Sequence, residues 1–457
     1  MTQTRPSTLW RWLVLGLCLF AFGKGVWDLG EQSLWWDESL SHYRATRPLA
    51  FILSNRMTFI DGDREVPITP DNHPPLYFCL LRLTLLAAGE SEFALRFPSL
   101  AAGVLLVPLL YRAGAWLYGP RAGAGAAALG ALSPLYLWAQ QEARPYALLT
   151  LLALLAFYAT VRATARRTTP RPGEDAGSPP SPGRGAWIAV AVLATAAMLV
   201  THYHGFTLLP ALAAIGVLAR RRWSRRDLAL LGAGALLVLL LALWALRALP
   251  RQAEIPGYVA LPLGTLLQDV FRATPLGVAG SATPLLKALP FAWFSAALLA
   301  GSLLVLAAGG KARSSRPALY LLCAFALPVA AVYLLSFVRP AYMNIRHLIV
   351  ASPFYFIAVG AALPQARSVG ARAALAAGLV LLLAGMGLST EAYLAGYAKE
   401  DHRGWGRYLS QHVRPDDLVL INPGASAQLY FYYVESPARW YGFPLLGASA
   451  EQTLAQI

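Results

Sequence analysis

The chain has 457 residues, of which 57% are hydrophobic and only 13% charged. Soluble globular proteins have about 45–50% apolar and about 25% charged residues, so the composition argues against a string of soluble domains. The net charge of +15 is typical of nucleic-acid binding, of contact with an anionic surface, or of basic loops on one side of a membrane. Nucleic-acid binding does not fit a chain this apolar. The positions of the charged residues along the chain decide between the two remaining explanations.

Eleven apolar stretches are predicted to cross a membrane, since a transmembrane helix needs about 20 mostly apolar residues. They cover residues 9–28, 94–111, 122–139, 146–161, 186–201, 205–219, 228–246, 285–308, 318–337, 348–363 and 373–393. The first is read as an uncleaved helix, because the bulky residues Trp27, Trp35 and Trp36 follow it in place of a small-residue cleavage site. The predicted fold class is an all-α polytopic membrane protein.

Residues 74–89 form a further apolar stretch whose role is ambiguous. The stretch is short, begins with Pro74 and Pro75, and carries Arg82 in its middle. Counted as a span, it would invert every later loop and place most basic clusters outside. With eleven spans and a cytoplasmic N-terminus, the inner loops hold 19 basic and 3 acidic residues, as the positive-inside rule requires. We therefore predict that residues 74–89 form a helix lying in the outer interface.

This topology divides the chain into four regions. An N-terminal membrane module, 1–165, contains the largest outer loop, 30–93, with an interfacial helix starting near Asp37. A Pro/Gly/Ser-rich stretch, 166–185, is predicted to be a disordered cytoplasmic linker. The C-terminal transmembrane helices, 186–393, include a loop with a short interfacial helix around 262–273.

The last region, 394–457, is mixed and polar. It reads as a helix at 402–413, a strand at 417–421 and a helix or strand at 426–434. We expect a small extracytoplasmic α/β region, which is either truncated or packed on the membrane helices.

Most ionisable groups lie on the outer side in this topology. Twenty of the 23 acids and all seven histidines fall there or at the outer membrane edge. Longer outer loops would explain this without any function, but any chemistry is predicted outside. Asp37 and Glu38 stand where the first helix leaves the bilayer. They either cap the following helix and complement its dipole, or one of them serves as a general base.

The other candidates lie at the outer ends of predicted spans, where charges are costly and suggest function. They are His73, Arg96, Glu142, Arg144, Tyr146, His202, Arg346 and His347. An arginine beside a histidine suits a phosphate oxyanion. The alternative is that these side chains reach ordinary lipid headgroups. His202 and His204 also have a spacing that could bind a divalent metal, although no dense set of partners lies nearby in sequence.

Several common sites are missing from the sequence. There is no P-loop, no dinucleotide fingerprint and no HExxH motif. Cys18, Cys79 and Cys323 lie in apolar segments and predict neither a disulfide nor a metal framework. No soluble cofactor is expected.

Four motifs in the N-terminal module resemble a family of bacterial membrane glycosyltransferases. These enzymes are related to the protein O-mannosyltransferases and to the transferase that adds aminoarabinose to lipid A. The motifs are WWDESLSHYRA, HPPLYFCLLRL, LRFPSLAAGVLLVPLLYRAGAWLYG and QEARPYALLTLLALLAFYA, followed later by THYHG and NIRHL.

The resemblance implies a GT-C fold and a polyprenyl-phosphate monosaccharide as donor, used with inversion at the outer face of a bacterial plasma membrane. By analogy Asp37 accepts the proton of a lipid, glycan or protein acceptor, and Glu142 is a second acidic position. His73 stands where the aminoarabinose transferases have lysine, which implies a phosphate contact. Asn72 replaces the acidic residue before it, which argues against carrying over that branch's metal site.

Two other functions compete with this one. A transporter or flippase for lipid-linked sugars predicts repeated halves with broken helices and polar groups in mid-membrane. A polymer ligase predicts its key residues in a large later outer loop. The sequence shows neither pattern.

Overall fold

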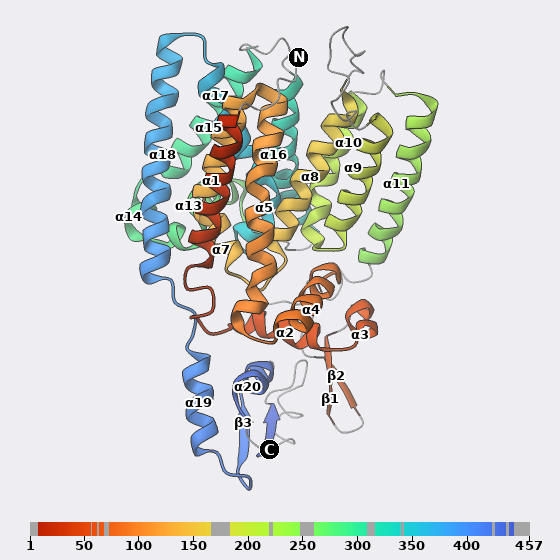
Figure 1. Cartoon of the computed structure of the whole chain (residues 1–457), viewed down its shortest axis with the longest axis vertical. Helices are drawn as coiled ribbons and strands as arrows, with labels where there is room; N and C mark the ends of the chain where they lie inside the picture. Colours follow the sequence, from red (N-terminus) through yellow and green to blue (C-terminus); the bar gives the residue numbers. More distant parts are fainter. Residues whose placement is uncertain are drawn as a thin grey trace.

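The structure is a computed structural model. It describes residues 8–55, 57–61, 64–67, 73–165, 183–218, 223–246, 260–308, 316–338, 340, 342–422, 426–435 and 438–442. Figure 1 shows most of the helices side by side in one bundle. The first residues of α1 lie at one end of the bundle, and α2, α4 and α19 lie at the other.

Six described helices are long and apolar enough to cross a membrane. They are α1 (Thr8–Val26), α5 (Glu92–Tyr118), α8 (Tyr146–Thr164), α16 (Arg316–Leu335), α18 (Val369–Gly396) and the span Ile345–Gln365, made of η3 (Ile345–Ala351) and α17 (Ser352–Gln365). The bent pair α6 (Pro120–Leu132) and α7 (Pro134–Gln140) would be a seventh. The predicted all-α, multi-pass membrane protein is confirmed.

The remaining predicted spans also fall on helices of the bundle. These helices are α9 (Arg184–Leu199), η1 (Tyr203–Leu208) with α10 (Leu209–Leu218), α11 (Arg225–Leu246) and α15 (Phe291–Ala307). Several are shorter than a full membrane crossing, so the count of eleven remains a prediction. The predicted linker lies almost entirely outside the described residues, which resume just before α9.

The predicted span 122–139 is broken rather than straight. Its two halves, α6 and α7, meet at an angle of 58°. The Ser133 hydroxyl accepts a hydrogen bond from the Tyr136 amide at 3.3 Å, and Pro134 begins α7. Lys24 Nζ donates to the carbonyl of Ala131 at 2.8 Å and to that of Ser133 at 3.2 Å. These bonds satisfy backbone groups that the bend removes from the helical ladder.

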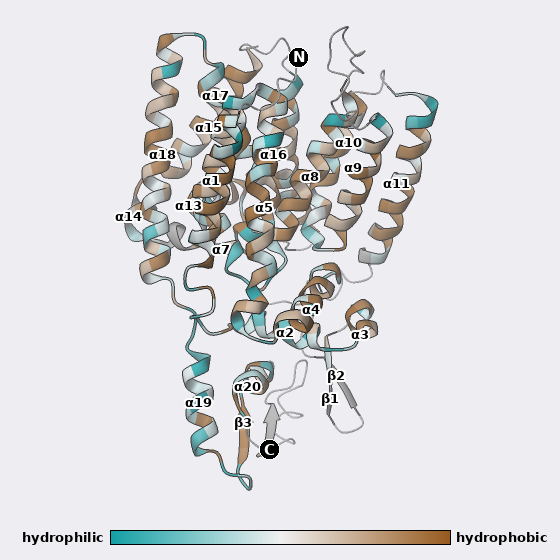
Figure 2. Cartoon of the chain, viewed as in Figure 1, coloured by the Kyte–Doolittle hydropathy of each residue, from teal (hydrophilic) through white to brown (hydrophobic). Residues whose placement is uncertain are grey.

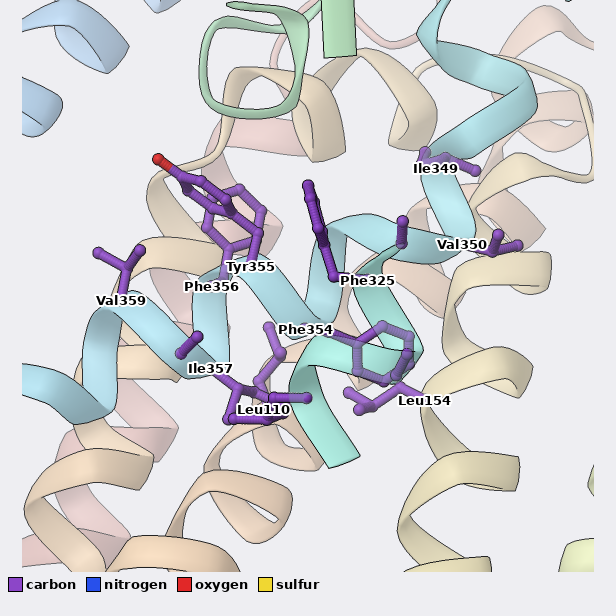
Figure 3. Packing of buried hydrophobic residues seen from close by; sticks show 14 of the residues in the cluster. Leu110, Leu154, Phe325, Ile349, Val350, Phe354, Tyr355, Phe356, Ile357 and Val359 are labelled. Carbon is purple, nitrogen blue, oxygen red and sulfur yellow. The ribbon is translucent and has the colours of Figure 1, made fainter. Parts of the chain in front are cut away.

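The core of the bundle lies around α17. In an 18-residue stretch of the span Ile345–Gln365, 89% of the residues are buried. Figure 3 shows its aromatic residues Phe354, Tyr355 and Phe356 packed near Phe325 and other apolar side chains. Figure 2 shows the contrast between the largely hydrophobic bundle and the hydrophilic residues on α19.

Two glycines let α6 and α17 pass at close range. A Cβ on Gly360 would lie 2.5 Å from the Ala126 amide nitrogen, and one on Gly125 would lie 2.4 Å from the Gly360 carbonyl oxygen. Small residues at such crossings are how membrane helices gain packing contacts.

The first loop folds into a layer at the end of the bundle. It contains α2 (Trp36–Thr46), α3 (Leu49–Ser54), an antiparallel pair of β1 (Thr58–Asp61) and β2 (Arg64–Pro67), and α4 (Leu76–Ala88). Figure 1 shows α4 beside α2 and α3 below the long helices, in agreement with the prediction that residues 74–89 are not a span. The strand pair was not predicted, because its sequence reads as a polar turn.

The tail lies at the same end of the molecule. It contains α19 (His402–His412), β3 (Leu418–Ile421), α20 (Ala427–Tyr433) and β4 (Arg439–Gly442), with β3 and β4 parallel. The ambiguous stretch 426–434 is therefore a helix. Within the tail, β3 and β4 are the only strands among the described residues, so the predicted α/β lobe is not shown. Residues 443–457 lie outside the described part.

The predicted helix at 262–273 is longer in the structure. It is α13 (Leu263–Ala282), interrupted at Gly277, where φ is +69°, and followed by α14 (Pro284–Ala288). At Gly277 a Cβ would lie 2.9 Å from the Leu135 amide nitrogen, so α13 approaches α7 closely there.

Candidate active site

Asp37 lies in the first turn of α2, at the end of the bundle, with only 5% of its surface exposed. Its Oδ2 atom is 3.3 Å from Arg346 Nη1 and 3.5 Å from Arg144 Nη2. The two arginines come from η3 and from the turn between α7 and α8. Two guanidinium groups against one carboxylate leave an excess positive charge, which favours binding of an anion.

Glu38, the next residue, faces a different set of partners. Its carboxylate accepts hydrogen bonds from Arg96 Nε and Nη2, both at 2.8 Å, and from the Ala143 amide at 2.8 Å. It also accepts from the Trp35 amide at 3.4 Å, which completes a cap on α2. Burial would raise the pKa of Glu38, but Lys399 and Arg96 lower it to about 2. Glu38 thus caps α2 and pairs with Arg96 and Lys399, whereas Asp37 faces Arg144 and Arg346.

Arg96 ties the first loop to α5. Besides Glu38, its guanidinium donates to the carbonyls of Leu29, Gln32 and Ser33 at 2.8–2.9 Å. Its described hydrogen bonds therefore all go to the protein itself, which favours a role in organising the loop over the predicted contact with substrate.

Glu142 is a second buried acidic residue in this region. Its Oε2 accepts a hydrogen bond from Trp35 Nε1 at 2.6 Å, and its Oε1 is 3.2 Å from Lys399 Nζ. Burial raises the pKa of Glu142 to about 7, against the opposing charge of Lys399. Glu142 therefore belongs with Glu38 in one ion-pair network.

Lys399 is the residue of this network that sequence reasoning missed. It follows α18 and contacts Glu38 Oε2 at 3.0 Å as well as Glu142. Its backbone amide donates to Gln32 Oε1 at 2.9 Å. The chain has only four lysines, which is the one signal in the sequence that could have drawn attention to it.

The predicted histidines come together beside Arg144. His73 Nε2 is 2.5 Å from Arg144 Nη2, and its ring lies 4.5 Å from that of His202. Tyr146 packs against His202, with ring centroids 5.6 Å apart, and stacks on Trp138. Tyr146 is almost fully buried, so its ring packs against His202 on the side facing the protein interior.

His347 completes this group from η3. Its ring stacks on that of His204, with centroids 4.4 Å apart, and its Nδ1 accepts a hydrogen bond from the Met343 amide at 3.0 Å. Tyr342 lies next to His347 and donates a hydrogen bond to Asp269 of α13. The predicted candidates from distant parts of the sequence thus lie in one region, and His204 joins them.

A metal site is not evident in this region. Among the described residues, no three or more His, Cys, Asp or Glu side chains are arranged to hold a metal ion. The arrangement instead combines arginines, histidines and one carboxylate, which suits a phosphate group and a proton-accepting base.

Comparisons with known proteins bear on the class of reaction. Residues 72–172 match the model of the family described as dolichyl-phosphate-mannose-protein mannosyltransferase. This segment holds His73, Arg96, Glu142, Arg144 and Tyr146. No curated protein matches the chain.

The predicted glycosyltransferase resemblance is confirmed.

Solved structures show that the likeness in fold extends over nearly the whole chain. ArnT from Cupriavidus metallidurans in the apo state has 14% identity and a TM-score of 0.58, and the match covers 98% of this chain and 88% of that one. The same protein bound to undecaprenyl phosphate has 15% identity and a TM-score of 0.57, with the same coverage. The oligosaccharyltransferase AglB from Archaeoglobus fulgidus, in complex with an inhibitory peptide and a dolichol-phosphate, has 13% identity and a TM-score of 0.53, covering 95% of this chain and 65% of that one.

These likenesses establish a GT-C-like fold for this chain. At such identities they say nothing of individual residues, so the roles of Asp37 and its neighbours rest on the geometry described above.

Proposed function

We propose that this glycosyltransferase moves a monosaccharide, with inversion, from a polyprenyl-phosphate donor to a lipid, glycan or protein acceptor. The observation that carries the proposal is the placement of Asp37 between Arg144 and Arg346 at one end of the bundle. A carboxylate and two guanidinium groups supply the two things this reaction needs, a base for the acceptor and positive charge for the leaving phosphate.

Asp37 is the proposed general base. As the acceptor attacks the anomeric carbon, its hydroxyl or amine proton passes to the Asp37 carboxylate. The bond between the anomeric carbon and the phosphate oxygen breaks, and both electrons stay on the phosphate. Arg144 and Arg346 then stabilise the charge that develops on the departing group, which is the largest contribution we assign to catalysis.

Four other residues complete the proposed donor site. His73 contacts Arg144, His347 follows Arg346 in the chain, and His202 with Tyr146 backs His73. Glu38, Arg96 and Glu142 are proposed to hold the loop that carries Asp37, because their described contacts are with Lys399, with the Trp35 side chain, with the backbone and, for Glu38 and Arg96, with each other.

The proposed topology places this end of the bundle outside a bacterial plasma membrane. Eleven spans with a cytoplasmic N-terminus support it, because they leave the basic clusters in the inner loops. The first loop and the tail 394–457 then face the extracytoplasmic side, and residues 166–185 form a cytoplasmic linker. No soluble cofactor is needed in this scheme.

A purified-protein assay tests the function. The enzyme in detergent or liposomes is given a panel of polyprenyl-phosphate sugars with candidate acceptors, and free polyprenyl phosphate is measured. We expect release with at least one donor and its abolition in Asp37→Asn. The matched control is Asp28→Asn, an exposed aspartate before the same loop, which should keep wild-type activity. Full activity of a folded Asp37→Asn protein would refute the proposed mechanism.

A further inference from the structure

Four histidines form a continuous buried column beside the proposed donor site. The column runs His73, His202, His204, His347, with successive ring centroids 4.5, 5.1 and 4.4 Å apart. None of the four residues is more than 8% exposed. They come from the turn before α4, from the start of η1 and from η3, so the fold brings together residues that are far apart in sequence.

One end of the column meets an arginine that also contacts Asp37, since Arg144 Nη2 lies 2.5 Å from His73 Nε2 and 3.5 Å from Asp37 Oδ2. At the other end, the residue before His347 in the chain is Arg346, whose Nη1 lies 3.3 Å from Asp37 Oδ2. The column and the proposed base therefore face the same anion site.

The charged and titratable groups around the column are mostly cationic or neutral. They are Asp37 from α2, Arg144 from the turn before α8, Tyr146 of α8, Tyr203 of η1, Tyr342 and Arg346 from the segment entering α17, and Asp269 of α13. The helix α10 contributes no ionisable side chain, and Arg184 of α9 pairs with Asp227. Asp269 is engaged with Tyr342, which leaves Asp37 as the one carboxylate at the arginines among the described residues.

His202 shows what the column lacks. Its Nδ1 accepts a hydrogen bond from the His204 amide at 3.1 Å, so the proton of the neutral ring sits on Nε2. Nε2 is buried and has no hydrogen-bond partner among the described residues. A buried donor without an acceptor costs about 1–3 kcal/mol, so this position favours an acceptor supplied by a ligand.

The free column is held in its neutral state. Burial lowers the pKa of His202 well below its ordinary value, and the neighbouring histidines and Arg144 lower it further. A ligand with two negative charges reverses this effect, because it offsets the positive charges that disfavour protonation.

We propose that the histidine column takes up a proton when the site binds a phosphate monoester, the leaving group of the proposed reaction. The inference rests on the proposed function. The donor is a phosphodiester with one negative charge, whereas the departed polyprenyl phosphate is a monoester with two. Transfer also releases one proton from the acceptor hydroxyl, which Asp37 accepts and then passes to the column. The column retains this proton in the product complex, so the charge of the occupied site changes little during the reaction.

Isothermal titration of the purified full-length protein with farnesyl phosphate tests this. At about pH 8 the probe is nearly all dianion, since phosphate monoesters have a second pKa near 6. The binding enthalpies measured in Tris and in HEPES differ by the number of protons taken up multiplied by the difference between the two buffers' heats of ionisation. We expect uptake approaching one proton, and an affinity that falls by up to about tenfold per pH unit above about pH 7.5.

Two variants and one ligand serve as controls. His202→Gln with His204→Gln should bind with little proton uptake, whereas His412→Gln, exposed on α19, should behave as wild type. Farnesyl methyl phosphate, a diester with one charge, should bind without uptake.

The outcomes separate this inference from the proposed function. Wild-type binding of farnesyl phosphate with the same heat in both buffers overturns the proton uptake and leaves the glycosyltransferase site standing. Absence of any binding, together with no release of polyprenyl phosphate in the transfer assay, removes both. If the double variant does not fold, the wild-type comparison of two buffers and two probes still decides.

Discussion

Lys399 and Glu38 are 361 positions apart in the chain, yet Lys399 Nζ lies 3.0 Å from Glu38 Oε2. The same ammonium group contacts Glu142. One lysine from the segment after α18 thus balances two buried carboxylates, one beside Asp37 and one beside Arg144. The beginning of the tail 394–457 is in this way part of the structure that holds the proposed active site.

Replacement of Lys399 by Met should destabilise the protein strongly. Removing one partner of a buried ion pair leaves an uncompensated charge and costs about 3–5 kcal/mol. Thermal unfolding in detergent measures the effect, with Lys287→Met, at an exposed position on α14, as control. Adding Glu142→Gln to Lys399→Met should recover part of the loss, because it removes one of the stranded carboxylates. An unchanged midpoint in Lys399→Met would contradict the network.

Glu142 should make stability depend on pH. The folded protein keeps a proton on Glu142 up to about pH 7, whereas an ordinary glutamate releases it near pH 4.5. The folded state therefore binds more protons in this window, and stability falls as the pH rises from about 4.5 to about 7, by at most about 1.4 kcal/mol per unit. Glu142→Gln removes this dependence. The unfolding midpoint of the variant minus that of wild type should therefore increase as the pH rises. Glu31→Gln, at an exposed position, is the control, and a difference that stays constant with pH would exclude the effect.

Arg346→Gln should weaken binding of the phosphate more than it weakens the fold. A hydrogen bond to a charged group contributes about 1.5–3 kcal/mol, which corresponds to a loss of affinity of roughly tenfold to a hundredfold. The affinity of Arg346→Lys should lie between those of wild type and Arg346→Gln, because lysine keeps the positive charge but lacks the paired donors of the guanidinium group. Titration with farnesyl phosphate measures this. Arg112→Gln, exposed and in the last turns of α5, should bind as wild type does, and equal affinities for all variants would exclude Arg346 from the site.

Gly360→Ala should lower stability by about 1–3 kcal/mol, as overpacking does in other cores. The added methyl would lie 2.5 Å from the Ala126 amide nitrogen, so α6 and α17 would have to separate. Gly301→Ala in α15 is the matched control, since nothing lies within 4 Å of its added Cβ. Equal unfolding midpoints for the two variants would show that the close crossing does not limit packing.

The sequence predicted the membrane helices well because their signals are local. A run of apolar residues marks a span whatever its neighbours are. Pro74, Pro75 and Arg82 set residues 74–89 apart from the predicted spans, and α4 lies below the long helices in Figure 1. Pro134 after Ser133 carried the signal for the bend between α6 and α7, but hydropathy over a window averages such a break away. The β1–β2 pair was missed because its stability depends on pairing between two short polar segments.

The site was harder to predict, because its contacts join distant segments. Hydropathy and the positive-inside rule placed Asp37 and Arg346 on the same side, but not within 3.3 Å of each other. Two adjacent acids also have different partners in the structure. Nothing in the sequence of the pair Asp37-Glu38 shows that Asp37 faces Arg144 and Arg346. Lys399 lies in a polar stretch with other charges, where its burial depends entirely on tertiary structure.

The contact between Lys399 and the first loop also orders events during synthesis. Glu38 and Glu142 are made early, and their partner emerges from the ribosome only after α18. Until then Glu142 lacks the lysine that pairs with it, and Glu38 is paired with Arg96 alone. A nascent chain in which the segment after α18 has not yet been made therefore lacks part of the network around the proposed active site.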